Sequence, residues 1–323
     1  MTDFHFDEVI DRRRTDSIKF DFFEAYSMPE DAIPLWVADM DFRSPPAVID
    51  ALKAAADFGV FGYTYSSDRY FQTVCRWFAE RHGWNPTPDE IVPTPGVMFA
   101  AATAVRVLTR PGDAVLIQQP VYYPFQKSIE ENGRVCIVNE LCYDGETYSM
   151  DFDDFERKIV EQKVRLFLLC SPHNPVGRVW TGEELTRMAA VCRRHDVFVV
   201  ADEIHADLVL SERRRHRVFA SLDPETAQRT AVLTAPTKTF NLPGLHVANA
   251  FIPNAEIRRR FADECRRLFY YGNDLPGLRA ARAAYSFGGE WLDALLIYLR
   301  ENVRLLTENC SALGRTRTPR GEA

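Results

Sequence analysis

The sequence predicts an α/β protein with a parallel β-sheet at its centre. Short apolar runs alternate with amphipathic segments of helical length between residues 114 and 252, a pattern typical of helices that cover a parallel sheet. Unusual loops follow three of these runs, at residues 171–177, 202–205 and 234–244. Since parallel strands carry ligand sites just past their C-terminal ends, we expect the three loops to meet at one edge of the sheet.

Capping and turn residues set the boundaries of the predicted elements. Ser or Thr caps, Pro at the first helical position and Gly at helix ends mark most of the helices, and Thr181 with Glu184 forms a capping box. Predicted helices span residues 45–58, 68–83, 97–108, 125–131, 153–161, 183–194, 255–269, 275–285 and 291–313. Predicted strands span residues 114–117, 135–138, 164–169, 197–201, 231–234 and 247–252.

Two segments fall outside this alternation. Residues 1–43 form an irregular arm that needs another surface to pack on, and residues 59–65 form a loop rich in Gly and Tyr. The small-residue run at 97–108 predicts a buried helix, because alanines permit close packing against a sheet. The chain shows no internal repeat and no low-complexity segment.

The composition favours a globular protein and argues against a nucleic-acid-binding protein or a zinc protein. A length of 323 residues with 46% hydrophobic content is ample for a packed core. A net charge of -7 argues against a nucleic-acid surface, so the basic run at 213–217 is interpreted as a solvated turn. The seven cysteines are scattered and lack a C-x-x-C pair, which favours reduced thiols in the cytoplasm and no zinc site. Neither a signal peptide nor a membrane-spanning run is evident.

Lys238 stands out by its composition. The chain from Val164 onward contains 22 arginines and this single lysine. Arginine stays protonated, whereas a lysine among apolar neighbours can become a free amine and form a Schiff base with an aldehyde. Pro236, Pro243 and Gly244 predict a rigid, non-helical loop around it. Taken alone, the same pattern also fits a solvated loop lysine.

Other candidate site residues follow strand ends or open a helix. Asp202 ends an apolar strand, so its carboxylate needs a cationic partner, which could be a cofactor ring nitrogen or an arginine. Asn174 lies next to Pro175 in a loop that also contains Pro172, and its only role could be to form a turn. Tyr122 could stack on a flat ring or cover the core. Gly96 opens a helix whose backbone N–H groups could bind phosphate. No P-loop or G-x-G-x-x-G motif supports nucleotide binding.

Together these residues carry a resemblance to a known family. The sequence resembles fold-type I pyridoxal-phosphate enzymes, and more narrowly the cystathionine β-lyase or C-S lyase subgroup of the class I/II aminotransferase superfamily. The resemblance implies a mixed, mostly parallel sheet with helices on both faces. Six motifs carry it in chain order: W-V-A-D-M-D-F from Trp36, G-Y-T-Y from Gly62, P-V-Y-Y-P from Pro120, S-P-H-N-P-V-G-R around Asn174, V-A-D-E-I-H around Asp202 and T-A-P-T-K-T-F-N-L-P-G around Lys238.

The resemblance implies pyridoxal 5'-phosphate as cofactor and a role for each residue around it. Lys238 would form the Schiff base, Asp202 would keep the pyridine nitrogen protonated, and Asn174 would hydrogen-bond the ring oxygen. Tyr122 would stack on the ring. His205, also implied to contact the cofactor, stands where general aminotransferases often have a tyrosine, as in the lyase subgroup. Gly96, Val97 and a hydroxyl of Thr237 or Thr234 would bind the phosphate, because His246 replaces the arginine expected there.

The resemblance also implies a homodimer and a substrate site. Tyr63 would reach the phosphate of a neighbouring subunit, and the substrate would contact Ala38, Tyr63 and Asn174. Residues 1–43 would form the arm and part of a small domain, 44–288 the large cofactor-binding domain, and 289–323 the start of a C-terminal small domain. The family continues past the point matching Ala323 into a segment with the arginine that pairs with the substrate carboxylate. We therefore expect the sequence to be truncated, leaving an apolar face of the last helix exposed: Leu292, Leu295, Leu296, Leu299, Val303 and Leu306.

The expected activity is that of a carbon-sulfur β-lyase. Such an enzyme cleaves cystathionine or a related S-substituted L-cysteine to a thiol, pyruvate and ammonia. A class I/II aminotransferase is the alternative, and only His205 and the loop at 39–41 separate the two. A truncated, non-catalytic protein that binds pyridoxal phosphate is a further alternative. The protein is expected in the cytoplasm, without nucleic-acid or membrane partners.

Overall fold

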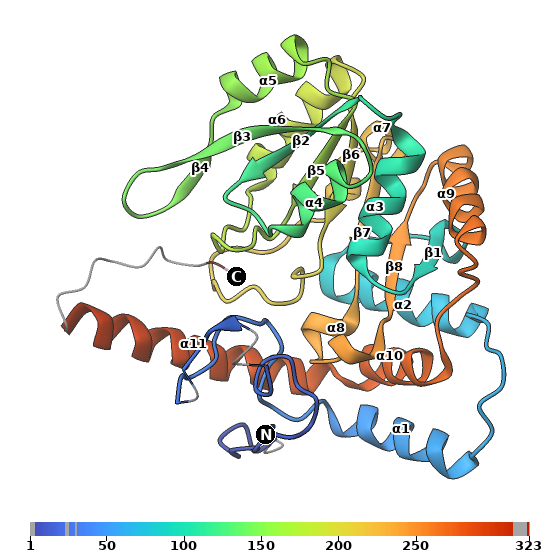
Figure 1. The fold of residues 1–323 in the computed structure, drawn as a ribbon, viewed down its shortest axis with the longest axis vertical. Helices are drawn as coiled ribbons and strands as arrows, with labels where there is room; N and C mark the ends of the chain where they lie inside the picture. Colours follow the sequence, from blue (N-terminus) through green and yellow to red (C-terminus); the bar gives the residue numbers. More distant parts are fainter. Residues whose placement is uncertain (1–3, 23–25, 30, 313–321, 323) are drawn as a thin grey trace.

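An eight-stranded mixed sheet forms the centre of the computed structural model, which describes residues 4–22, 26–29, 31–312 and 322 (Figure 1). The strands lie in the order β1-β8-β7-β6-β5-β2-β3-β4. Adjacent strands from β7 to β3 are parallel, whereas β8 is antiparallel to β1 and β7, and β4 is antiparallel to β3. This confirms the mixed, mostly parallel sheet. The strands are β1 Ile91–Thr94, β2 Ala114–Gln119, β3 Val135–Tyr143, β4 Tyr148–Met150, β5 Leu166–Cys170, β6 Phe198–Asp202, β7 Thr230–Thr234 and β8 Ala248–Phe251.

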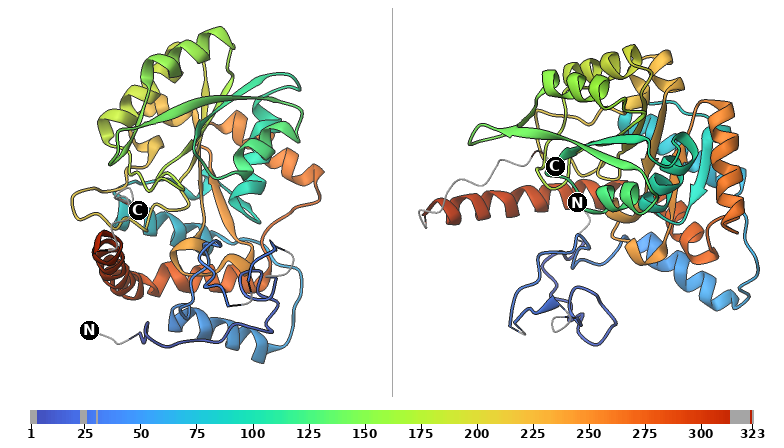
Figure 2. Two further views of the ribbon diagram at one scale, coloured as in Figure 1. Left: turned by 60° about the vertical axis from the view of Figure 1, so that its left-hand side comes forward. Right: turned by 45° about the horizontal axis from the view of Figure 1, so that its top comes forward.

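Helices cover both faces of this sheet, as Figures 1 and 2 show. All nine helices predicted from the sequence are present, and the box of Thr181 and Glu184 caps one of them. Two short helices, α7 and α8, were not predicted. The helices are α1 Pro46–Phe58, α2 Asp68–His82, α3 Val97–Leu108, α4 Pro124–Glu130, α5 Phe152–Glu161, α6 Gly182–Arg194, α7 Pro224–Gln228, α8 Pro236–Thr239, α9 Ala255–Arg267, α10 Leu275–Phe287 and α11 Gly289–Ala312.

Strand side chains alternate between two apolar clusters. In β2, Val115 and Ile117 join the cluster made with α3, α4 and α9, whereas Leu116 joins the cluster made with α5 and α6. In β5, Leu168 and Phe167 divide in the same way. Because successive strand residues point to opposite faces, a strand buried on both faces reads as one continuous apolar run. This explains why the sequence showed these strands clearly.

A third apolar cluster corrects the expectation for the last helix. Leu292 and Leu295 are fully buried, in a cluster that joins α11 to α1, α2, α10 and the end of the sheet at β7 and β8. Leu296 and Leu299 pack against the same cluster. Of the apolar face predicted to be exposed, Val303 and Leu306 remain accessible, at 43% and 63%. The helix therefore anchors its first half on this chain and projects its second half from it.

The basic run at 213–217 is also different from the prediction. Its central histidine, His216, is buried, and its Nε2 lies 2.7 Å from Oε2 of the buried Glu203. The other oxygen of Glu203 accepts the backbone N–H of Phe219 at 2.8 Å. Arg213, Arg215 and Arg217 are exposed, as expected of a solvated turn, so the difference is confined to the histidine side chain. In the structure this histidine holds the segment against the core.

The described residues of the N-terminal arm contain no α-helix or β-strand and pack on α11 (Figure 2). The ring centroids of Phe6 and Trp291 lie 5.7 Å apart, and those of Phe42 and Tyr298 lie 5.4 Å apart. Such edge-to-face pairs are a favourable aromatic geometry. The surface on which the arm packs is therefore that of α11. The last residues of the arm line a cavity together with Lys238.

The seven cysteines are all free thiols. Among the described residues, no group of three His, Cys, Asp or Glu side chains is placed to hold a metal ion. No helix in that part of the chain has the length and apolar character needed to cross a membrane.

Candidate active site

Three adjacent parallel strands bring the unusual loops together. Cys170 at the end of β5 is in register with Asp202 at the end of β6, and Asp202 is in register with Leu233 of β7. The loops that follow these strands therefore leave the sheet at the same edge, as parallel pairing requires. The convergence predicted from the sequence is confirmed.

Asp202 is a buried carboxylate at this edge. It is 6% exposed, and one of its oxygens accepts the N–H of Ile204 at 3.1 Å. Burial raises the pKa of Asp202 to about 7, while that hydrogen bond and the Lys238 charge oppose the rise. No lysine, arginine or histidine of the described chain forms an ion pair with it. The cationic partner predicted for Asp202 is therefore not one of the described residues.

Lys238 lies in α8, directly after β7, so the predicted non-helical loop is wrong. Pro236 is the first residue of this short helix, a position where its missing N–H leaves no bond unmade. Burial lowers the pKa of Lys238, and the carboxylates of Asp39 and Asp202 oppose that change. Within the described ranges the amine has no ion pair or hydrogen bond. Burial therefore makes the amine easier to deprotonate than that of an exposed lysine, which favours its use as a nucleophile.

Two hydrogen bonds tie the loop of Asn174 to the loop after β2. The N–H of Tyr122 donates to the carbonyl of Asn174 at 3.0 Å, and Nε2 of His173 lies 2.9 Å from the carbonyl of Pro120. Burial raises the pKa of Tyr122, and the nearby charges of Tyr123 and Asp202 add to the effect. Tyr122 and Asn174 are therefore held together on the side of the site where Asp202 lies.

The N-terminus of α3 and the end of β7 supply uncommitted polar groups. Gly96 is the N-cap of this helix and Val97 its first residue, and a side chain added at Gly96 would meet no atom within 4 Å. The first N–H groups of a helix lack intrahelical partners and favour anions. Thr234 is buried, and its Oγ1 has no partner among the described residues. Thr237, in α8, is also buried.

Two histidines flank the lysine segment. Burial lowers the pKa of His205 to about 4, and the charge of Lys238 contributes. His205 is therefore neutral at physiological pH. His246 has a left-handed backbone conformation and lines the same cavity as Lys238.

The arm closes one side of this cavity, whose volume is about 670 Å³. Val37 and Asp39, the neighbours of Ala38, line it together with Lys238. Ala38 itself is exposed. The predicted substrate contact at Ala38 thus lies beside the lysine segment.

Tyr63 is not brought to this site within one chain. Its side chain is fully exposed, in the loop between α1 and α2. Phe61 and Tyr65, in the same loop, are also exposed. The loop therefore presents aromatic rings to solvent or to another molecule.

Sequence reasoning missed two residues that organise the site. Arg12 pairs with the carboxylates of Asp39 and Asp41. The side chain of Asn241 bonds the backbone of Met40 in both directions at 2.9 Å. The only signal in the sequence was the proximity of Asn241 to Lys238, since a bond across 201 residues leaves no local pattern.

The chain is similar to known proteins over most of its length. Residues 30–321 match the family described as aminotransferase class I and II. The chain belongs to this family. It is 42% identical over 299 residues to cystathionine beta-lyase PatB of Bacillus subtilis (strain 168), a match covering 93% of this chain and 77% of that protein. It is 32% identical over 311 residues to protein MalY of Escherichia coli (strain K12), covering 96% and 79%.

Solved structures of this family superpose closely. A PLP-bound putative aminotransferase from Clostridium difficile 630 has a TM-score of 0.95 at 35% identity, covering 99% of this chain and 83% of that one. Cystalysin from Treponema denticola, which contains a pyridoxal 5'-phosphate cofactor, has a TM-score of 0.91 at 37% identity, covering 96% and 79%. The resemblance to the C-S lyase subgroup and the fold are confirmed.

Pyridoxal 5'-phosphate, the cofactor implied by this family membership, fits the residues present. The buried carboxylate of Asp202 has no cationic partner among the described residues, and the cofactor's ring nitrogen would be a cation when protonated. The amine of Lys238 has no partner in the described chain, and its lowered pKa suits reaction with an aldehyde. Thr234 Oγ1 and the first N–H groups of α3 are suited to a phosphate.

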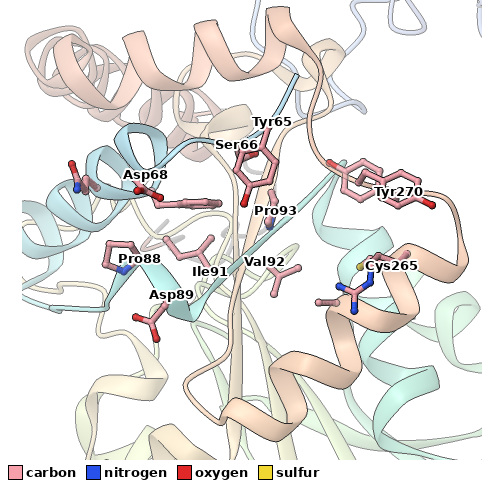
Figure 3. Close-up of a pocket in the computed structure, with 15 residues that line it drawn as sticks. Tyr65, Ser66, Asp68, Pro88, Asp89, Ile91, Val92, Pro93, Cys265 and Tyr270 are labelled. Carbon is pink, nitrogen blue, oxygen red and sulfur yellow. The ribbon is translucent and has the colours of Figure 1, made fainter. Parts of the chain in front are cut away.

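A second cavity, of about 750 Å³, lies between α2, β1 and α9 (Figure 3). Its lining includes Tyr65, Asp68, Phe71, Cys265 and Tyr270. None of the residues lining the Lys238 cavity contributes to it. This cavity is slightly larger than the one that Lys238 lines.

Proposed function

We propose that the protein is a pyridoxal-phosphate-dependent carbon-sulfur β-lyase acting on cystathionine or a related S-substituted L-cysteine. The observation that carries the proposal is the position of Lys238 just past the end of β7, next to the strand that ends in the buried Asp202, a carboxylate with no ion pair among the described residues. The match to a cystathionine beta-lyase at 42% identity supports the choice of reaction.

Lys238 and Asp202 are assigned the central roles. When bound, the cofactor supplies an electron sink for the charge left on Cα after proton removal. Lys238 holds the cofactor through its amine, and after the substrate amine takes its place it removes the Cα proton as general base. Asp202 keeps a proton on the ring nitrogen, because an ionised carboxylate stabilises the cation beside it.

Other residues are assigned to binding the cofactor and orienting its ring. Asn174 donates its amide to the ring oxygen, and Tyr122 packs against the ring face. His205, being neutral, adds no charge beside Lys238. The backbone N–H groups of Gly96 and Val97 bind the phosphate, with a hydroxyl from Thr237 or from the unpartnered Thr234.

The complete site is proposed to need two copies of the chain. Tyr63 is too exposed to serve its own site, and its loop presents Phe61 and Tyr65 beside it. In a homodimer this loop lies against the partner and Tyr63 reaches the partner's cofactor and substrate. Ala38 and Asn174 of the same chain complete the substrate contacts.

The lyase reaction follows from elimination at Cβ. Once the Cα proton is removed, the Cβ–S bond breaks and the sulfur leaves as a thiolate, which is protonated. The remaining three-carbon unit takes up water and is released as pyruvate and ammonia. For cystathionine, the sum is one water consumed and one homocysteine, one pyruvate and one ammonia formed. The free cysteines support a reducing compartment such as the cytoplasm.

A direct assay separates this function from the alternatives. The chain loaded with cofactor is incubated with cystathionine, and pyruvate and free thiol are measured without any added 2-oxo acid. Equal amounts of both products are expected. Products that form only when a 2-oxo acid is supplied would indicate an aminotransferase. Cofactor binding without turnover under either condition would indicate a non-catalytic protein.

A further inference from the structure

A network of charges fixes the arm beside the lysine segment. Arg12 bonds the carboxylate of Asp39, and it also bonds Asp41 at 2.7 Å. The buried Lys19 holds the same turn, through Asp41 at 2.9 Å and the carbonyl of Asp39 at 3.0 Å. Asp39 thus has one oxygen, Oδ2, committed to a cation of its own arm.

The side chain of Asn241 clamps this arm to the segment that carries Lys238. Its Oδ1 accepts the N–H of Met40 at 2.9 Å, and its Nδ2 donates to the carbonyls of Met40 and Phe42 at 2.9 and 2.8 Å. All hydrogen-bonding groups of its amide are used. Because Asn241 lies three residues after Lys238, the clamp sets the position of Asp39 relative to the lysine.

The second oxygen of Asp39 is uncommitted. Its Oδ1 is buried and has no hydrogen-bond partner among the described residues. Asp39 and Lys238 line the same cavity. A buried carboxylate oxygen without a donor is unfavourable, so this atom is suited to a cation that enters the cavity. The charged or titratable groups around Lys238 come from the arm, from the end of β6 and the loop after it, and from the segment after α8: Arg12, Asp39, Asp41, Arg43, Asp202, His205 and His246.

We propose that Asp39 is a positioning residue whose Oδ1 receives the protonated amine of Lys238 whenever that amine is not bound to the cofactor. This inference rests on the proposed function, in which the substrate amine releases Lys238 during each turnover. A released lysine is flexible, and a fixed carboxylate on the arm keeps its amine in the cavity. The direction of the Asp39 effect on the pKa of Lys238 agrees, since this carboxylate opposes the lowering caused by burial.

The test measures the amine itself and needs no enzyme activity. Cofactor-free protein is labelled briefly with acetic anhydride over a range of pH, and mass spectrometry compares Lys238 with the exposed Lys127. In Asp39→Asn the protonated amine loses its carboxylate, so the pH of half-maximal labelling of Lys238 is expected to fall by at least about 0.5 unit. Asn241→Ala is expected to give a smaller fall, and Asp39→Glu to restore much of the wild-type value.

Asp41→Asn is the matched control. This substitution removes a carboxylate that lies in the same turn as Asp39 and that also bonds Arg12. Asp41, however, is not among the charges that act on the pKa of Lys238. Its half-labelling pH is expected to equal that of wild type. An unchanged value in Asp39→Asn overturns the proposal, and so does an equal shift in the two variants, which would indicate loss of arm structure.

A second variant covers the case in which Asp39→Asn does not fold. Arg12→Gln removes the cation that neutralises Asp39, so the half-labelling pH of Lys238 must rise. A fall or no change overturns the proposal. Because labelling is read in the cofactor-free chain, these outcomes are independent of whether the enzyme proves to be a lyase.

Discussion

A carboxylate buried at the end of a strand is unfavourable when ionised, and Asp202 meets this condition whenever no cation lies beside it. Its pKa of about 7 lies above the ordinary value of 3.8. A group whose pKa is raised by folding stabilises the folded state most at pH below its unfolded value. That contribution is lost as the pH rises through the folded value. The contribution of Asp202 to the stability of the folded state therefore falls between about pH 4 and about pH 7.

The first prediction concerns the stability of the cofactor-free protein across this window. Asp202→Asn should be more stable than wild type at pH 8, by an amount on the order of a few kcal/mol. The difference should shrink toward pH 4, because wild-type Asp202 is then protonated. Urea unfolding at several pH values, without cofactor, measures it. A variant that is less stable than wild type at pH 8 would contradict the buried-charge argument.

The second prediction concerns Lys238→Ala. The fold should be retained, since the amine makes no hydrogen bond or ion pair in the described chain. Lyase activity should fall by roughly 10²- to 10⁴-fold or more, because the general base is absent, and the cofactor should be removable by dialysis. Lys127→Ala, at an exposed lysine, is the control and should behave as wild type. Activity within a few-fold of wild type in Lys238→Ala would place the chemistry elsewhere.

Single residues were predictable from sequence where a local pattern carried the information. Lys238 stood out by composition, and Asp202 by its place at the end of an apolar run. His216 was misjudged because charge density on a loop does not show which side chain turns inward to meet Glu203. Arg12 and Asn241 could not be found, since each acts on a segment far away in the chain.

At the scale of elements, the sharp junction between α10 and α11 is tightly packed. A Cβ added at Gly288 would lie 2.5 Å from Cε1 of Phe240 and 2.6 Å from the carbonyl of Ala284. Phe240 follows α8 directly. The third prediction is that Gly288→Ala destabilises the protein by about 1–3 kcal/mol, as overpacking does. It should also weaken cofactor binding, because Phe240 must move.

Gly289→Ala provides the matched control for this junction. A Cβ at Gly289 meets nothing within 4 Å, and alanine favours helix over glycine. Gly289→Ala should therefore be neutral or slightly stabilising. Thermal unfolding and cofactor titration of both variants measure the effects. If both variants had the same unfolding temperature and the same cofactor affinity, the contact with Phe240 would not restrict the side chain at position 288.

Element types were predicted better than element pairings. The small-residue run gave α3 its observed limits, Val97–Leu108. Strands β1 and β4 were missed because they have four and three residues, too few for a period, and β1 contains Pro93. The antiparallel pairing of β8 with β1 joins segments distant in sequence, so no local pattern predicts it. For α8, Pro236 was interpreted as a helix breaker although it also favours a first helical turn.

At the scale of the whole molecule, the fourth prediction tests whether two chains share each site. Lys238→Ala and Tyr63→Ala chains should both be nearly inactive alone. After mixing and subunit exchange, a hybrid dimer has one site with an intact lysine and an intact partner tyrosine. With statistical exchange about one quarter of the wild-type sites should recover. No recovery despite exchange confirmed by mass spectrometry would show that Tyr63 does not act across a dimer.

The clamp between Asn241 and Met40 also has a consequence for biosynthesis. The two residues are 201 positions apart. At typical rates of translation the ribosome needs roughly 10–40 s to make the intervening chain. Throughout that interval the arm is attached to the nascent chain without its anchor, and β1 waits for β8 as its edge partner. Chaperones that recognise apolar segments therefore have tens of seconds to bind Trp36 and its neighbours before the site can form.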